Sequence, residues 1–307
     1  MAQKYGKWNN ASFYPNCNRL NGYISEYSTE KMLYGDAMEV QVRHYYNNDY
    51  MKIGGFEMNI LIRVAASDGV TKGQLEKYLI LQGMIIDENI LEDRLYNLVK
   101  FGYLSWVKFR RLKDNFEIQL YDITARGLAT MKHSELPERK VGSACYSNND
   151  FIRAVRNKIV SNQIVLHLLC EQANLKSFYF QRELLKPEIG MNIKPITVPL
   201  YIQTDSYNYI IEYVSDTRKG KESFKERMNL LHSGIETLAQ NTVIVLVAET
   251  YAHMEMLSSE TYAYEKDDPN LKLLYTHDSE WFYDTAGHFY AMARAMGQSG
   301  IMGVKML

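Results

Sequence analysis

Apolar residues between Gly54 and Gly102 recur every three or four positions, which is the spacing of helices that bury one face. The spacing predicts three helices. Their apolar rows are Phe56, Ile60 and Val64; Leu75, Tyr78 and Leu79; and Leu91, Leu95 and Leu98. Thr71, with Gln74 at the capping-box position, is placed to begin the second helix, and Asp87 is placed to cap the third.

Two β-prone runs, residues 103–109 and 116–123, follow the third helix and predict a hairpin. Thr124 then caps a last short helix. A helix, a hairpin and a capped helix in this order are typical of a winged helix-turn-helix. In such a domain the helix enters the major groove of DNA, and the hairpin, called the wing, contacts the backbone.

After residue 150 the pattern changes to strands separated by helices. A helix beginning near Asn149 or Asp150 is followed by strands at 178–184, 197–204 and 207–214, a helix at 223–240, a strand at 242–249, a helix at 251–264 and a strand at 271–275. This order predicts an α/β domain with a central mixed sheet, as in restriction-endonuclease-like folds. A final helix is predicted over 288–296, and residues 300–307 are expected to fray.

A length of 307 residues is enough for two cores, and the pattern predicts how they divide. Residues 1–52 form an arm rich in Tyr and Asn, with one short helix at 30–43; residues 53–133 form the winged helix-turn-helix; residues 134–150 are a linker; and residues 151–307 form the second domain. The arm is expected to pack on the domain behind it. The alternatives are a dimer contact or a segment that stacks on nucleic acid.

The formal net charge of −1 excludes a diffuse basic field, so DNA binding requires a local patch. The outward side chains of the third helix and the cations of the wing predict that patch. Its members are Asn89, Tyr96, Asn97, Lys100, Lys108, Arg110, Arg111 and Lys113. Glu92 and Asp93 oppose it, because carboxylates beside phosphates lower affinity unless they accept from cytosine amino groups. A winged domain that binds protein is the alternative.

Other chemistry finds little support in the sequence. Cys17, Cys145 and Cys170 are far apart, so they are expected to be reduced, and the seven histidines lack metal-ligand spacing. No nucleotide-binding loop or nucleophile elbow is present, so neither a metal nor a cofactor is expected. Without a signal sequence or a membrane-length apolar run, the chain is expected in the cytoplasm and away from membranes.

Three short motifs resemble the replication-relaxation proteins of mobile elements. They are Ile123-Thr124-Ala125-Arg126-Gly127-Leu128; Lys194-Pro195 or Val198-Pro199 before a strand; and Ile210-Ile211-Glu212 with Lys225 on the following helix. The resemblance covers residues 53 to about 290 and implies a winged helix joined to a restriction-endonuclease-like domain. It also implies double-stranded DNA as the partner and a role in replication, transfer or gene control. A second copy of the chain, or replication or transfer proteins, are further candidate partners.

An active nuclease of that fold needs an Asp at a strand entry and a Glu-x-Lys on the next strand, to hold Mg²⁺ and stabilise charge. Here Ile196 or Leu200 stands at the Asp position, and Glu212 is followed by Val214 where the lysine belongs. We therefore expect no catalytic residues and no enzyme activity. The alternatives are a metal-dependent nuclease completed by Lys225 from the helix and by Glu183 as a second carboxylate, or an interaction scaffold.

Overall fold

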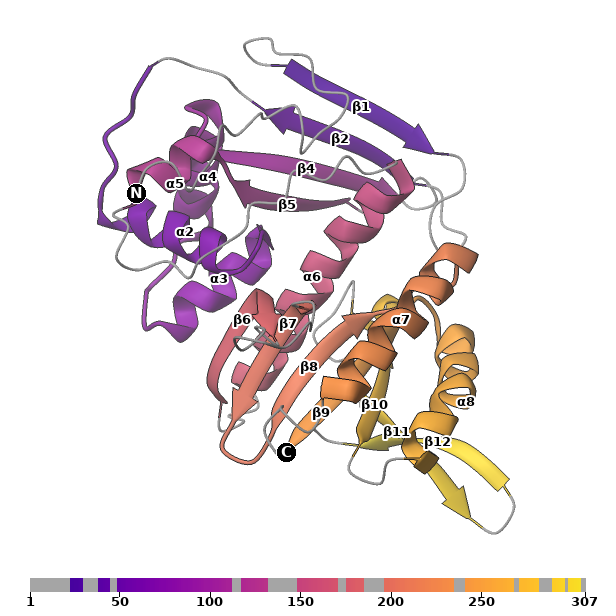
Figure 1. Cartoon of the computed structure of the whole chain (residues 1–307). Coiled ribbons are helices and arrows are strands. Elements are labelled where there is room, and N and C mark those ends of the chain that lie inside the picture. The colour runs from indigo at the N-terminus through magenta and orange to yellow at the C-terminus, as the bar shows by residue number, and fades with distance from the viewer. Residues whose placement is uncertain are drawn as a thin grey trace, which may run out of the picture. The chain divides into compact units, whose positions relative to one another are not determined.

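The computed structural model describes residues 23–29, 38–44, 49–111, 117–131, 148–170, 175–184, 196–234, 241–267, 271–281, 289–295 and 298–304 (Figure 1). The chain divides into two compact units, Met1–Asn162 and Gln163–Leu307, and the boundary falls within one helix, α6 (Asn148–Cys170). The first unit combines helices with a small antiparallel sheet. The second is a mixed sheet with helices, so the chain is an α/β protein.

The first unit contains the predicted helices and hairpin. Its elements are β1 (Tyr23–Thr29), β2 (Met38–His44), α2 (Gly55–Ala66), β3 (Val70–Thr71), α3 (Lys72–Leu81), α4 (Glu88–Lys100), β4 (Leu104–Arg111), β5 (Glu117–Ile123) and α5 (Ala125–Thr130). The strands form one antiparallel sheet in the order β1-β2-β4-β5-β3. The short strand β3, between α2 and α3, therefore pairs with the second strand of the hairpin.

Capping side chains explain where these helices begin. The Thr71 hydroxyl accepts from the Gln74 backbone N–H at 3.2 Å, and the Gln74 side-chain oxygen accepts from the Thr71 N–H at 3.1 Å, which is the predicted capping box. Thr124 caps α5 by accepting from Gly127 N–H at 3.1 Å. A Cβ at Gly127 would overlap the carbonyl oxygen of Tyr103, so only glycine allows this close approach.

The helix predicted at residues 30–43 is wrong over its second half, because Met38–His44 form strand β2. The segment alternates apolar Met38, Val40 and Val42 with polar residues, which is the period of a strand. It pairs along β4, from Met38 opposite Arg111 to Arg43 opposite Trp106. Residues 30–37 lie outside the described part. The arm therefore contributes two strands, β1 and β2, to the sheet.

A buried polar network holds the first half of α6 within the first unit. The Asn162 side chain, 0% exposed, accepts from the Tyr78 hydroxyl at 3.0 Å and donates to the carbonyl oxygens of Ser67 and Gly69 at 3.0 and 2.8 Å. One α6 residue thus fastens the end of α2 and the body of α3. Because buried polar groups are costly when unpaired, this network specifies one arrangement of these elements.

The second unit contains a seven-stranded sheet. Its elements are β6 (Leu175–Leu184), β7 (Ile196–Thr204), β8 (Asn208–Tyr213), α7 (Arg218–Gly234), β9 (Thr242–Ala248), α8 (Tyr251–Asp267), β10 (Lys272–His277), α9 (Asp278–Trp281), β11 (Phe289–Ala295) and β12 (Gln298–Val304). The spatial order is β12-β11-β10-β9-β8-β7-β6, with β8, β9 and β10 parallel and the other neighbours antiparallel. The predicted central mixed sheet is confirmed.

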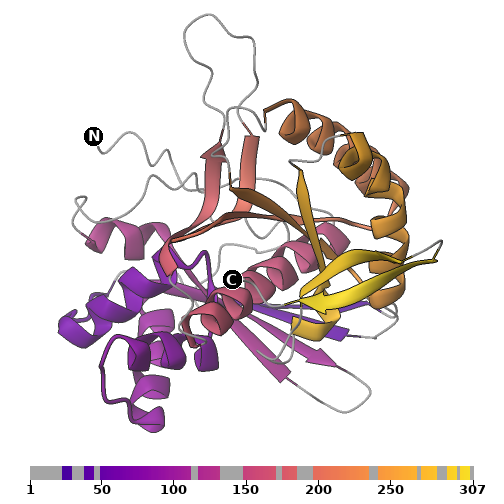
Figure 2. The same ribbon diagram turned by 90° about the horizontal axis from the view of Figure 1, so that it is seen from below.

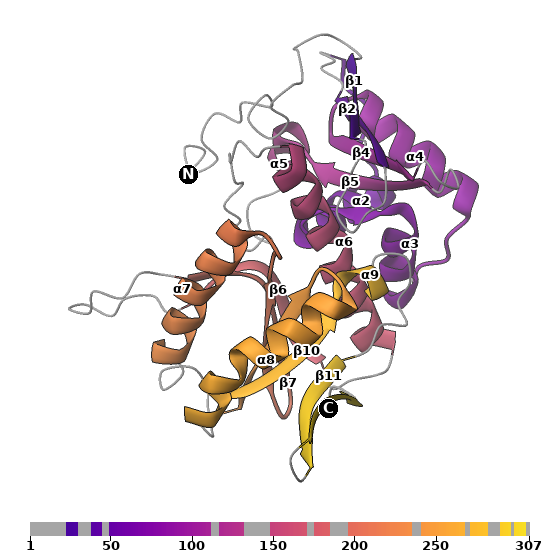
Figure 3. The ribbon, with the colours of Figure 1, turned by 90° about the vertical axis from the view of Figure 1, so that its right-hand side faces the viewer.

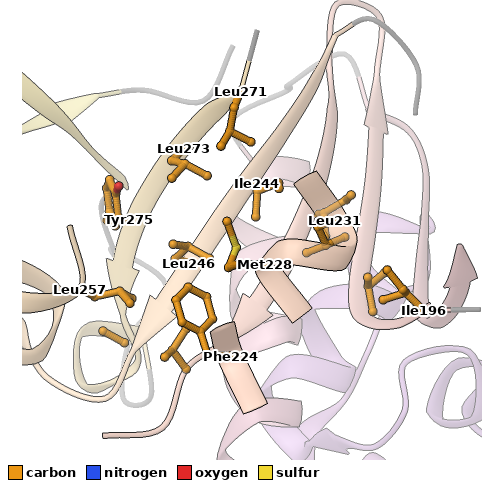
Figure 4. Packing of buried hydrophobic residues seen from close by; sticks show 14 of the residues in the cluster. Ile196, Phe224, Met228, Leu231, Ile244, Leu246, Leu257, Leu271, Leu273 and Tyr275 are labelled. Atoms are coloured by element: carbon orange, nitrogen blue, oxygen red, sulfur yellow. The ribbon is translucent and has the colours of Figure 1, made fainter. Parts of the chain in front are cut away.

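One apolar face of this sheet is covered by α7 and α8, which lie side by side (Figures 2 and 3). Met228 and Leu231 of α7 and Leu257 of α8 pack against Ile244 and Leu246 of β9, and all five are at most 1% exposed (Figure 4). Every residue of β9 is buried, as expected for a central parallel strand. No helix among the described residues is long and apolar enough to cross a bilayer.

The helix predicted at 288–296 is wrong over 289–295 and the fraying predicted for 300–307 is wrong over 300–304, because β11 and β12 form an antiparallel hairpin that extends to Val304. Residues 305–307 lie outside the described part of the chain. Phe289 pairs with Val304 and Ala295 pairs with Gln298, while Tyr290 joins the hairpin to β10 through Tyr275. Ala and Met in β11 favour helix locally. Pairing with β10 and with a glycine-containing partner strand outweighs that preference.

Candidate nucleic-acid interface

Helix α4 presents the predicted outward face. Leu91, Leu95 and Leu98 are 0% exposed, so the opposite side of the helix faces solvent. Tyr96 is 54% exposed, and the other predicted residues are exposed or, for Asn97, half-buried. The exposed side chains at helical spacing on this face are Asn89, Asp93, Tyr96 and Lys100.

The ends of α4 are fixed by short-range hydrogen bonds. Asp87 Oδ1 accepts from the backbone N–H groups of Asn89 and Ile90 at 2.9 and 3.2 Å, as predicted for its N-cap. At the other end Gly102 has a φ of +74°, a left-handed conformation that favours glycine and stops the helix. The Tyr103 N–H closes the end on the Leu98 carbonyl at 2.8 Å.

Lys72 on α3 neutralises part of the acidic charge on α4, an arrangement that the sequence pattern did not predict. Lys72 Nζ lies 2.8 Å from a carboxylate oxygen of Glu88 and 3.0 Å from one of Glu92. These two hydrogen bonds raise the pKa of Lys72. Arg94, on another side of α4, pairs with Glu57 of α2 at 3.0 Å. The predicted conflict between α4 carboxylates and phosphate is therefore reduced at Glu92 but remains at Asp93.

The predicted basic cluster lies on the hairpin of β4 and β5, and its members differ in what the structure describes. Lys108 Nζ is 2.7 Å from a carboxylate oxygen of Glu117 on β5, so this cation is already paired. Arg110 and Arg111 occupy the last positions of β4, and only their backbone is described. Lys113 lies outside the described residues. Because β2 pairs along β4, the hairpin is continuous with a wider sheet.

The Ile123–Leu128 motif is explained by packing around α5. Besides the Thr124 cap and the close approach at Gly127, Arg126 donates to the Phe101 carbonyl at 2.7 Å and to the Asp49 carbonyl at 2.6 Å. Its guanidinium also lies 4.4 Å from the centroid of the Tyr50 ring. Arg126 thus ties the chain entering α2 to the end of α4, and these contacts give it a structural role.

In the second unit Glu212 is engaged by an arginine. Its side chain is buried, and Arg227 on α7 binds both carboxylate oxygens, with Nε donating to Oε2 at 3.0 Å and the second contact running from a terminal nitrogen to Oε1. The same guanidinium donates to the Thr197 carbonyl at 3.0 Å. Burial raises the pKa of Glu212, and Arg227 acts in the opposite direction.

Three other residues considered for a nuclease centre, Ile196, Leu200 and Lys225, lie elsewhere than beside the Glu212 carboxylate. Ile196 and Leu200 are buried in the apolar interior, and Lys225 is exposed on α7. Lys225 instead lines a surface pocket of about 370 Å³ together with Asp216, Lys221 and Glu222. The side chain of Glu183 is outside the described part of the chain. Among described residues, no group of three His, Cys, Asp or Glu side chains could hold a metal ion.

Two histidines lie near the carboxyl ends of neighbouring strands, His253 on the first turn of α8 after β9 and His277 as the last residue of β10. His253 Nδ1 accepts from the Glu249 backbone N–H at 3.1 Å, which fixes the proton of the neutral ring on Nε2. His277 Nε2 lies 3.3 Å from a carboxylate oxygen of Glu280. Burial lowers the pKa of both histidines, against the opposing effect of nearby carboxylates.

His167 packs edge-to-face on Trp281, with ring centroids 5.4 Å apart, in keeping with a packing role.

Comparison with known proteins gives no guide to this geometry, since no known protein family and no curated protein matches the sequence.

Proposed function

We propose that the protein binds double-stranded DNA through a winged helix-turn-helix formed by α2, β3, α3, α4 and the β4–β5 hairpin. The observation that carries the proposal is the pairing of β3 with β5 beside β4. In a winged domain, a short strand lies between the first two helices and pairs with the hairpin that follows the third helix. In that domain the third helix, here α4, meets the major groove.

The residues proposed to contact DNA divide into two classes. Asn89, Tyr96, Asn97 and Lys100 on α4 would lie at base edges, where polar side chains read sequence. The cations of the hairpin would contact phosphate and position the domain. This second group consists of Lys108, Arg110, Arg111 and Lys113.

For the second unit we propose a restriction-endonuclease-like fold without nuclease activity, which serves DNA contact, dimerisation or partner docking. Support comes from the mixed sheet and from Glu212, whose carboxylate is occupied by Arg227. A metal-dependent nuclease built on Lys225 is disfavoured, because Lys225 lines a pocket with Asp216 and Lys221. The resemblance to replication-relaxation proteins suggests replication, transfer or gene control in a mobile element.

Selection of bound fragments from a random duplex pool tests the proposal. Enrichment of a common sequence, together with affinity that falls steeply as salt rises, is the expected result. No retention of any duplex at low salt would overturn it. The salt series also separates phosphate contacts, which are salt-dependent and tolerate any sequence, from base contacts.

A further inference from the structure

The segment from the end of α3 to the start of α4 exposes an unusual amount of apolar surface. Nine large apolar side chains are exposed among the described residues, and four of them lie in residues 80–90. Ile80 is 52% exposed, Leu81 48%, Ile85 101% and Ile90 50%. We call residues 80–90 the apolar stretch. Exposed apolar side chains scattered singly are ordinary, whereas a concentration of them marks a contact surface.

Acidic side chains accompany the apolar stretch. Asp87 lies within it, and Glu88, Glu92 and Asp93 stand on the first two turns of α4, all four exposed. Lys72 pairs with Glu88 and Glu92, so its single ammonium group offsets only part of the charge of these four carboxylates. The segment therefore combines exposed aliphatic side chains with net negative charge.

This charge discriminates between possible occupants. Anionic lipid surfaces, and phosphates that come close to these carboxylates, would be repelled, as Asp93 already opposes phosphate at the outward face of α4. A second copy docking through the same face would bring the two acidic rims together, because a two-fold contact places the same patch on both sides. A segment with an aliphatic ridge and flanking lysine or arginine meets both the apolar and the electrostatic requirement.

We propose that the apolar stretch is a docking surface for a basic amphipathic helix of a partner protein. Ile85 and Ile90 supply the apolar contact, and Asp93 with Glu88 supplies charge at the rim. Ile90 and Asn97 are seven residues apart on α4, and Asp93 belongs to the outward row, so the docking surface adjoins the outward face of α4. The proposal does not depend on the DNA-binding function.

The test uses the full chain and a fluorescent peptide of leucine and lysine at helical spacing, about five turns long. A peptide with glutamate in place of lysine and a scrambled leucine–lysine peptide are the controls. Fluorescence anisotropy should show binding of the first peptide alone. Affinity should fall by about tenfold or more in Ile85→Ser/Ile90→Gln and less, in a salt-dependent manner, in Asp93→Lys.

The matched control variant is Leu230→Gln, which removes an aliphatic side chain, 37% exposed, from α7 and should bind the peptide like the parent. Unchanged peptide binding by Ile85→Ser/Ile90→Gln, or equal binding of the glutamate peptide, would overturn the proposal. Dimerisation of the parent that the double variant abolishes, measured by sedimentation velocity, would also overturn it in favour of a second copy. Far-UV circular dichroism checks that each variant is folded.

Discussion

Arg227 of α7 and Glu212 of β8 form a two-pronged ion pair at the apolar interface between helix and sheet. The Glu212 side chain is 5% exposed and that of Arg227 is 32% exposed. Arg227 follows Phe224 and precedes Leu231 at helical spacing, and both of these residues are buried. The arginine therefore projects from the buried row of α7 onto the only carboxylate of β8. It also bonds the Thr197 carbonyl of β7, so one guanidinium connects three elements.

Removing the arginine should destabilise the second unit more than removing a neighbouring cation. Arg227→Met leaves the buried Glu212 carboxylate unpaired, which should lower the free energy of unfolding by about 3–5 kcal/mol. The matched control is Lys225→Met, an exposed cation two residues earlier, expected to change it by less than about 0.5 kcal/mol. Urea denaturation measures both. Equal stability of the two variants would contradict a structural role for the pair.

Acidification should destabilise the protein through His253 and His277. Burial lowers the pKa of both below the ordinary value of 6.5, so the unfolded chain binds more protons than the folded chain just below that pH. Their contribution to stability is therefore present above about pH 6.5 and is lost as pH falls toward the folded pKa. Protonation of His253 also removes the acceptor for the Glu249 N–H.

The check is the melting temperature between pH 8 and pH 5.5, compared with that of His253→Gln. The variant should lose part of the pH dependence, because glutamine does not titrate. His44→Gln, a histidine of the first unit, controls for the general loss of a titrating group. A melting temperature of the parent that rises on acidification would contradict the expected direction.

Local signals predicted much of the fold. The Thr71–Gln74 capping box, the Asp87 cap and the Thr124 cap each depend on residues at most three positions apart, and the structure contains all three. The apolar rows likewise follow from helical period. Such features can be read from a window of sequence, because the contacts that stabilise them are themselves local.

The failures concern pairing between elements, which local propensity does not reveal. β2 becomes a strand through pairing with β4, nearly 70 residues later, and β11 through pairing with β12 and with Tyr275. At the candidate sites, Lys72 meets Glu88 and Glu92 across a helix–helix turn, and Arg227 meets Glu212 from a helix to a strand. One sequence signal could have predicted the Arg227–Glu212 pair. Arg227 lies in the apolar row of its helix, and a cation in such a row requires a partner.

The hairpin should supply affinity without sequence preference. Arg110→Ala/Arg111→Ala should weaken binding to every duplex alike and flatten the dependence of log affinity on log salt by roughly one unit for each phosphate that is no longer neutralised. A matched control is Lys176→Ala/Lys272→Ala, which removes two cations from strands of the second unit. If the arginine variant binds DNA with the affinity and the salt slope of the parent, the hairpin is not part of the interface.

Asn97 should contribute sequence preference, since it is half-buried beside the outward row of α4 and an asparagine amide can bond a base edge bidentately. Asn97→Ala should weaken binding to the selected site by about 1–3 kcal/mol and leave binding to random duplex nearly unchanged. Asn59→Ala, on α2, is the control. Equal losses on both duplexes would instead assign Asn97 to backbone contact.

The second unit should not cut DNA. Magnesium in such a centre needs carboxylate oxygens from one or two side chains besides phosphate and water. Glu212 supplies one, but Arg227 already binds both of its oxygens, and in the proposed nuclease-like alignment the position of the second ligand falls on Ile196 or Leu200, both buried. In the same alignment Val214 takes the place of the lysine that would stabilise charge on the phosphate. Loss of one such group typically raises the activation barrier by a few kcal/mol.

Purified protein with Mg²⁺ or Mn²⁺ should therefore leave supercoiled, linear and single-stranded DNA intact, as gel electrophoresis would show. Arg227→Ala, which frees the Glu212 carboxylate, should not create activity, because the second ligand and the lysine are still missing. Cleavage by the parent that disappears in both Glu212→Ala and Lys225→Ala would establish the displaced-lysine nuclease instead. Cleavage that survives both substitutions would come from a contaminating enzyme, since neither residue could then belong to its active site.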